Sequence, residues 1–191
     1  MHLLARLTLA ATLAMGATAV MAAPVTAAQS VALQASKTSS TLTTAFSAVH
    51  TVAGEFIDTY TFTGASGLAW VNGSLTTIGS SQSVDIDFVS AVINGVSYSI
   101  TRSTWGSNAD GIELASLLNT SLTTPLVLTV HGFAGAGLAA GTAINASYTG
   151  TLNVTQVPEP ASLALAATGL LGLAAVRRRK GASTLPPAGR A

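Results

Sequence analysis

The side chains of this 191-residue sequence that could do chemistry are few and widely spaced. Asp85 and Asp87 are two residues apart, so on a strand they would share one face about 7 Å apart and, with a third oxygen ligand, could hold Ca²⁺. Two acids on the polar face of a strand more commonly keep it soluble and protect it against edge-to-edge association. No D-x-D-x-D-G calcium loop is present. The sequence therefore predicts no metal site and no cofactor.

The remaining candidates for catalysis are also isolated. His50 and His131 have no histidine or acid at metal-ligand spacing, which favours a filling role in the core or on the surface. Residues Gly135 to Ala140 match the dinucleotide fingerprint G-x-G-x-x-A, but no crossover helix and no acid before Glu159 follows them. That stretch is interpreted as a flexible loop between two strands. Without a cysteine or a G-x-S-x-G nucleophile motif, the sequence predicts a protein that is not an enzyme.

Asp58 has the most informative surroundings of any acid in the chain. It lies within Phe56-Ile57-Asp58-Thr59-Tyr60-Thr61-Phe62, where a strand would point Phe56, Asp58, Tyr60 and Phe62 to one face. A carboxylate among aromatic rings must accept hydrogen bonds, from backbone amides or from hydroxyl groups. The Phe56, Asp58, Tyr60 motif is therefore interpreted as structural, with Asp58 pinning a turn. A ligand or Ca²⁺ role for Asp58 is the alternative.

The elements that position these residues are predicted to be strands, because Ser and Thr are abundant and no long segment has helical periodicity. The clearest alternation runs over 144–155, with Tyr148 inward and Gly150 as a bulge or bend. Asn94-Gly95 predicts a hairpin between 91–93 and 96–100. A short helix is expected over 110–118, capped by Asp110. Further strands are predicted at 56–62, 68–71, 75–78, 84–88 and 126–131.

Seven or eight strands at this spacing predict a mainly β fold, an antiparallel β-sandwich or jelly-roll-like domain. We place this domain at 48–156, after a flexible N-terminal segment and first strand at 23–47. Residues 31–157 contain only two basic but six acidic side chains. This mildly acidic body lacks the basic surface that binding of nucleic acid requires.

Both ends of the chain have the composition of targeting segments. Residues 1–22 are typical of a secretory signal peptide, with a cleavage site after Ala28 as the alternative. The apolar run at 161–176 predicts a single transmembrane helix, although ~1.5 Å per residue gives about 24 Å against a hydrocarbon core of ~30 Å. Residues 181–191 are expected to be a disordered tail. The apolar run lies between a proline-rich motif of Val157, Pro158, Glu159 and Pro160 and a basic stop of Arg177, Arg178, Arg179 and Lys180.

The order of motif, apolar run and basic stop at 157–180 resembles the PEP-CTERM sorting signal of Gram-negative bacteria. The stretch 56–62 is also similar to the F-x-D-x-F signature of one group of PEP-CTERM proteins, with Tyr60 where that group has Phe. Tyr148-Thr-Gly-Thr-Leu152 resembles the strand that precedes the tail in this group. The resemblance implies export, transient anchoring in the inner membrane and processing by an exosortase-type transpeptidase. It assigns no biochemical activity.

The predicted function is therefore that of a non-enzymatic protein of the cell surface or extracellular matrix, embedded in the exopolysaccharide of a biofilm or floc. The alternative is a binding module for carbohydrate, or for ice through a flat Thr face. Trp105 is the better candidate for stacking against a sugar, because Trp70 lies between apolar neighbours and is expected in the core. Thr-x-Thr occurs only sporadically, which weakens the prediction of an ice-binding face.

Overall fold

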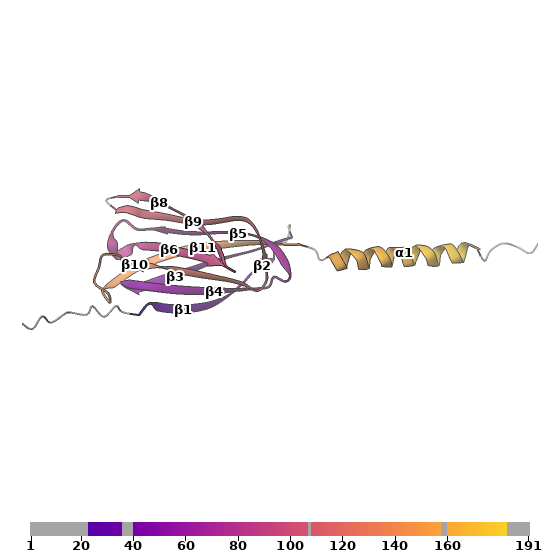
Figure 1. The fold of residues 1–191 in the computed structure, drawn as a ribbon, viewed down its shortest axis with the longest axis horizontal. Coiled ribbons are helices and arrows are strands. Elements are labelled where there is room, and N and C mark those ends of the chain that lie inside the picture. Colours follow the sequence, from indigo (N-terminus) through magenta and orange to yellow (C-terminus); the bar gives the residue numbers. More distant parts are fainter. Residues whose placement is uncertain (1–22, 36–39, 107, 158–159, 183–191) are drawn as a thin grey trace, which may run out of the picture.

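The computed structural model describes residues 23–35, 40–106, 108–157 and 160–182, and its body is mainly β, as the sequence predicts (Figure 1). The strands form two sheets, with the orders β1-β4-β10-β6-β7 and β2-β3-β11-β5-β9-β8. The first sheet contains β1 Val25–Ala32, β4 Gly54–Thr63, β10 Leu126–Ala134, β6 Ile86–Ile93 and β7 Val96–Ser97. The second contains β2 Gln34–Ala35, β3 Thr41–Val52, β11 Ala143–Gln156, β5 Leu68–Ile78, β9 Asn108–Thr123 and β8 Ser99–Trp105.

The described strand pairs are antiparallel except at one edge, where β1 runs parallel to β4. The expectation of an antiparallel domain is therefore correct for most of the body and wrong at β1. The jelly-roll alternative stays a prediction. Residues 23–47 were expected to be flexible apart from one strand, but they include β1, β2 and the first half of β3.

The core lies between the two sheets, and period-two alternation selects its members. Along β11 the side chains of Tyr148 and Leu152 are buried, while Thr149 and Thr151 are exposed. This confirms the alternation predicted for 144–155. The rings of Phe46 from β3 and Tyr60 from β4 meet across the two sheets, with centroids 4.5 Å apart. Aromatic side chains of both sheets therefore share one core.

Gly150 was expected at a bulge or bend, and the structure corrects this. Gly150 pairs in regular register with Phe46 on one side and with Leu75 on the other. A Cβ atom at this position would overlap the ring of Phe46 and lie 2.7 Å from Cδ2 of Leu75. The glycine is required by close packing against the core. The irregularity of β11 lies instead between Ala143 and Ala146.

The predicted hairpin forms, but its second arm divides between the sheets. Asn94 and Gly95 have φ angles of 46° and 83°, as a type I′ turn requires. The Asn94 side chain also accepts from the amide of Val127 at 2.8 Å, which fixes the turn to the start of β10. After the two-residue strand β7 the chain passes Tyr98 and enters β8 in the other sheet.

The short helix expected over 110–118 is wrong, because these residues belong to strand β9. Glu113, Ala115 and Leu117 are buried while Leu114 and Leu118 are exposed, which is the periodicity of a strand. β9 is paired on both sides, by β5 and by β8. These two ladders satisfy the backbone of the segment and override its helical pattern.

Two other boundaries differ from the prediction. The strands expected at 68–71 and 75–78 are one continuous strand, β5, because Asn72 and Gly73 remain paired. The strand expected at 84–88 begins only at Ile86, after a 3₁₀ turn, η1, at Gln82–Val84.

The C-terminal helix is longer than expected. α1 spans Pro160–Ala182, whereas the sequence predicted a transmembrane helix over 161–176 and disorder from 181. Within the described residues, no helix combines the length and apolar character that crossing a membrane requires, so the predicted transmembrane helix is not found. The signal peptide predicted at 1–22 lies outside the described residues, as do 183–191 of the expected tail.

Replacing Gly150 by Ala is expected to destabilise the body by about 1–3 kcal/mol, because the added methyl group overpacks the core against Phe46 and Leu75. The matched control is Thr149→Ala, the preceding residue, whose side chain lies on the exposed face, and it should change stability by no more than about 0.5 kcal/mol. Urea unfolding followed by circular dichroism measures both. Equal midpoints for the two variants would show that β11 is not held against β3 and β5 in this way.

Candidate functional site

The F-x-D-x-Y motif points into the core from β4, as the sequence predicts. Phe56, Asp58 and Tyr60 are all buried, with Asp58 only 2% exposed. They lie at alternate positions of one strand, which puts the carboxylate between two aromatic rings on the face turned toward the other sheet. Asp58 lies in the middle of a strand and does not pin a turn.

Asp58 is held by side chains that belong to the other sheet. The Tyr148 hydroxyl of β11 donates to Oδ2 of Asp58 at 2.6 Å, and Nε2 of His50, from β3, lies 3.1 Å from the same oxygen. Because the single hydroxyl proton of Tyr148 is given to Asp58, the Tyr60 hydroxyl donates to Tyr148, at 2.8 Å. Asp58, His50, Tyr148 and Tyr60 form a polar network inside the core, which we call the Asp58 network.

The environment of the Asp58 network keeps its hydroxyl groups neutral. Burial and the hydrogen bond to Asp58 raise the pKa of Tyr148 far above its ordinary value, and burial raises the pKa of Tyr60 to about 12. His50 stacks on Phe56 with ring centroids 4.1 Å apart, which fixes the imidazole plane. His50 also lines a small surface pocket of about 100 Å³. The arrangement is therefore a buried set of hydrogen bonds that links the two sheets.

Two members of this network were not predicted from the sequence. Tyr148 was expected on the inner face, and an inward hydroxyl on a strand is a signal for a buried acceptor. His50 was treated as a filler without an acid partner, but the crossing from β3 to β4 brings it to Asp58. The other histidine is also paired, because Nε2 of His131 lies 2.7 Å from Oε1 of Glu55. Both of these side chains are about 30% exposed, so this pair contributes little to stability.

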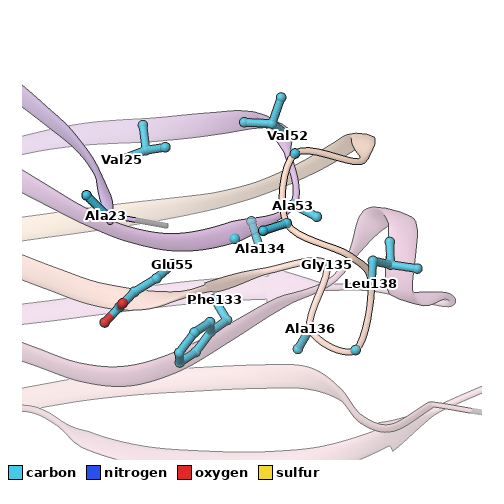
Figure 2. A pocket seen from close by; sticks show the side chains of 14 residues that line it. Ala23, Val25, Val52, Ala53, Glu55, Phe133, Ala134, Gly135, Ala136 and Leu138 are labelled. Atoms are coloured by element: carbon cyan, nitrogen blue, oxygen red, sulfur yellow. The ribbon is translucent and has the colours of Figure 1, made fainter. Parts of the chain in front are cut away.

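A larger pocket opens beside the Gly/Ala loop that joins β10 to β11. Its volume is about 530 Å³, and apolar side chains dominate the view in Figure 2, with Glu55 as the charged group among those labelled. The loop carries the G-x-G-x-x-A match, and Gly135 and Gly137 have φ angles of 64° and 84°. No helix follows, because the chain enters β11 at Ala143. The interpretation of this stretch as a loop is confirmed.

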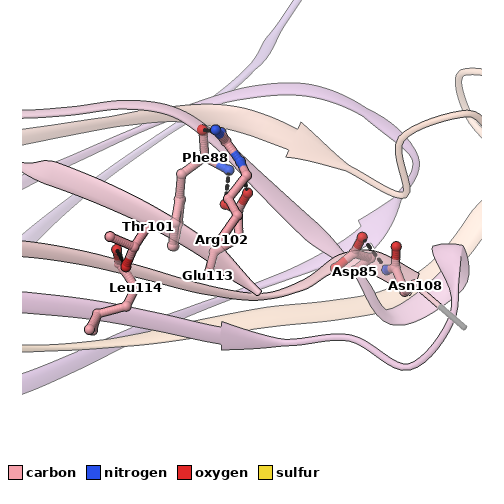
Figure 3. A network of polar contacts seen from close by, with 7 residues as sticks. All are labelled: Asp85, Phe88, Thr101, Arg102, Asn108, Glu113 and Leu114. Carbon is pink, nitrogen blue, oxygen red and sulfur yellow. Dashed lines mark hydrogen bonds and ion pairs between the residues drawn. The ribbon is translucent and has the colours of Figure 1, made fainter. Parts of the chain in front are cut away.

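A second polar link joins the sheets through Glu113, Arg102 and Phe88 (Figure 3). Glu113 of β9 is completely buried and pairs with Arg102 of β8, while Arg102 also donates to the carbonyl of Phe88 in β6. Burial raises the pKa of Glu113, and its hydrogen bonds to the Phe88 amide and to Arg102 act in the opposite direction. The pair thus connects β8 and β9 to the five-stranded sheet.

Asp85 and Asp87 were expected together on the solvent face of a strand, and this is wrong. Asp85 lies just before β6 and is buried, and Asp87 is partly buried. Asp85 accepts a hydrogen bond from Nδ2 of Asn108 at 2.7 Å. These acids therefore face protein groups of β9 and do not serve as solubilising charges.

The proline-rich motif begins where the sheet ends. The amide of Val157 donates to the carbonyl of Leu68 at 2.9 Å, directly after the last residue of β11. Pro158 and Glu159 lie outside the described residues, and Pro160 is the first residue of α1. The basic stop from Arg177 to Lys180 lies within the last turns of the same helix. The two described residues of the motif thus stand at the end of the β body and at the start of a helix.

The Asp58 network supplies a test of how strongly it joins the sheets. Tyr148→Phe removes the donor to Asp58 and is expected to destabilise the body by about 1–3 kcal/mol, since the carboxylate stays buried with one partner fewer. Tyr60→Phe is the matched control, because it removes one hydroxyl and leaves the bond from Tyr148 to Asp58 in place. Thermal melting and urea unfolding should give the larger loss for Tyr148→Phe. A larger loss for Tyr60→Phe would contradict this description of the network.

Comparisons with known proteins bear on the C-terminal segment. The family model of the PEP-CTERM protein-sorting motif matches residues 156–180. A comparison with curated proteins finds no match. Among solved structures the chain is similar to Aeromonas hydrophila PliG, a periplasmic lysozyme inhibitor of g-type lysozyme, at 11% identity over 69% of this chain and 98% of that chain, with a TM-score of 0.24. A likeness of this size supports no argument about fold or function.

The matched residues extend from the end of β11 through the proline-rich motif to the basic stop. They do not extend to Phe56, Asp58 and Tyr60, so the F-x-D-x-F group stays a prediction. The order of strand β11 and helix α1, with the basic residues in the last turns of that helix, agrees with the resemblance seen in the sequence. This protein therefore carries a PEP-CTERM protein-sorting motif at residues 156–180.

Proposed function

We propose that this chain is an exported, non-enzymatic protein of the cell surface or extracellular matrix, sorted through its C-terminal segment and processed by an exosortase-type transpeptidase. The match of residues 156–180 to the PEP-CTERM protein-sorting motif carries the proposal. The motif concerns where the protein is sorted. The role of the β body must be inferred from the body itself.

The titratable side chains of the body support a structural role. The Asp58 carboxylate and the Tyr148 hydroxyl are used inside the core, and Glu113 is neutralised by Arg102. The His131 and Glu55 pair lies on the surface of neighbouring strands. The larger pocket is lined mostly by small and apolar residues of the Gly/Ala loop and the strands around it. None of these arrangements combines an accessible nucleophile with a base.

The position of the motif suits removal of the tail. The last hydrogen bond of the body is made by the Val157 amide, and the core residues all precede this point. Cleavage at the Pro-Glu-Pro sequence would therefore remove α1 without exposing the core. The prolines lack amide hydrogens and restrict the residues before them to extended conformations, which is the form in which a peptidase binds its substrate.

Replacing both Pro158 and Pro160 by Ala is expected to impair processing, because α1 can then extend toward β11 and withdraw the segment from the peptidase. Mass spectrometry of the surface and extracellular fractions measures the ratio of intact to truncated protein. The matched control is the double replacement Pro186→Ala with Pro187→Ala, which removes two prolines beyond the basic stop.

We expect wild type and control to end near Pro160 and the motif variant to end at Ala191. Intact wild-type protein in a host with an active exosortase would refute the proposed sorting. If the motif variant were processed as completely as wild type, the prolines would not be what the peptidase recognises.

A second candidate function, carbohydrate binding by the same exported body, is favoured by Trp70. The sequence predicts this residue in the core, but Trp70 is 49% exposed, because Ala69 and Val71 take the inward positions of β5. It is paired with Thr155 on one side and Ser121 on the other. An exposed ring flanked by hydroxyl groups is suited to stacking against a sugar while its polar neighbours hydrogen-bond to it. Trp105 is similarly exposed, at 47%.

Trp70→Ala is expected to weaken binding to exopolysaccharide purified from the host about tenfold, which corresponds to a stacking contribution of about 1.4 kcal/mol. Trp105→Ala is the comparison, since it removes an equally exposed ring that lies on β8 at the edge of the sheet. Co-sedimentation over a range of polysaccharide concentrations gives the affinities. Unchanged binding by both variants would remove the carbohydrate-binding candidate and leave the sorting proposal intact.

A further inference from the structure

The fold gathers three aspartates that are distant in the sequence. Asp85 immediately precedes β6, Asp87 is its second residue, and Asp110 lies near the start of β9. β6 and β9 belong to different sheets and lie against each other. One carboxylate oxygen from each aspartate lies within 4.8 Å of the other two. The third oxygen ligand that the sequence lacked is supplied by Asp110, which had been assigned to a helix cap.

Two of the three aspartates each have a buried carboxylate oxygen without a hydrogen-bond partner. Asp85 is only 4% exposed, and its Oδ1 has no partner although Oδ2 accepts from Asn108. Oδ1 of Asp87 is likewise buried and without a partner. An unsatisfied buried carboxylate oxygen is costly, so native proteins normally provide a donor or a metal ion. Oδ1 of Asp58 is also unpartnered in the core, but there it is a single atom, whereas here two such atoms belong to neighbouring aspartates.

No basic side chain compensates the charge of this cluster in the described part of the chain. The Arg102 guanidinium pairs with Glu113, and the other ion pairs of the described residues involve the two histidines. Burial, followed by repulsion from Asp85, Asp110 and Glu113, raises the pKa of Asp87 to about 7. The acids therefore repel one another in the absence of a counter-charge.

The geometry matches one hard cation. Two oxygen ligands at the 2.3–2.6 Å typical of Ca²⁺ can be at most roughly 4.6–5.2 Å apart, which accommodates the 4.8 Å limit of this cluster. An all-oxygen donor set disfavours zinc, which selects nitrogen and sulfur ligands. Asn108, hydrogen-bonded to Asp85, adds an amide oxygen close to the cluster. Water molecules would complete the six to eight ligands that Ca²⁺ takes.

We propose that Asp85, Asp87 and Asp110 form a binding site for a divalent cation, with Ca²⁺ as the ion that suits its donors. The ion connects the start of β6 in one sheet to the start of β9 in the other. It neutralises the repulsion among the three carboxylates and supplies the counter-charge that the described part of the protein does not provide. An affinity of about 10⁻⁴–10⁻³ M is expected, as in extracellular modules whose surroundings supply the ion.

The test is the melting temperature of the purified full-length protein after treatment with a chelator. It is measured in 10 mM CaCl₂ and, for comparison, in NaCl of equal ionic strength. This Ca²⁺ concentration is about ten times the weakest expected Kd. We expect Ca²⁺ to raise the melting temperature by several degrees. Asp110→Asn and Asp87→Asn should each abolish the rise, and both should melt at least as high as wild type without Ca²⁺ because a repelling charge is gone. Glu55→Gln, which neutralises an acid outside the cluster, should keep the full response.

Terbium provides a second readout that does not depend on stability. Trp105 lies beside Gly111, the residue after Asp110, since their Cβ positions would be 3.1 Å apart. Excitation of tryptophan should therefore sensitise emission from Tb³⁺ bound at the cluster, and Ca²⁺ should displace it. A wild-type protein with neither a Ca²⁺-dependent rise in melting temperature nor displaceable Tb³⁺ emission would overturn the proposal. So would a Ca²⁺ response retained in Asp110→Asn.

Discussion

The buried carboxylate of Asp58 is the constraint on which the arrangement of the two sheets depends. It lies on β4 in the five-stranded sheet, but its partners Tyr148 and His50 come from β11 and β3 in the other sheet. A buried charge that loses its partners costs far more than an apolar contact. The two sheets must therefore face each other in the one register that brings Tyr148 to Asp58. The apolar contacts of the core are non-directional, so they select this register less strictly than the hydrogen bonds do.

Glu113 imposes the same kind of condition at the far side of the core. Its carboxylate is satisfied only when Arg102 of β8 and the backbone of Phe88 in β6 meet it together. The body thus combines an apolar core with two polar links, and neither link uses a disulfide, since the chain has no cysteine. The aspartates at the start of β6 and β9 differ from both links, because their charges are gathered without a protein cation.

Much of the fold was predictable from local pattern, and the exceptions have physical causes. Alternation identified β4, β10 and β11, and Asn94-Gly95 identified the turn, because these signals depend on neighbouring residues only. The pattern at 110–118 is compatible with a helix as well as a strand, and the segment is a strand because it pairs with β5 and β8. For the same reason the sequence could identify Asp58 as a buried acceptor but not name His50, and it could not bring Asp110 to Asp85. These contacts join residues far apart in the chain, which no local pattern records.

The order of the strands has a consequence for the timing of folding. β11 is the last strand of the body in the sequence, yet it occupies the middle of its sheet, between β3 and β5. A chain exported from its N-terminus delivers β3 and β5 first and leaves each with an open edge until β11 follows. Tyr148 is part of β11, so the hydrogen bond from its hydroxyl to Asp58 cannot form until β11 has been exported. The body can therefore close only when nearly all of it has been delivered, and the segment that emerges next is the one that carries the sorting motif.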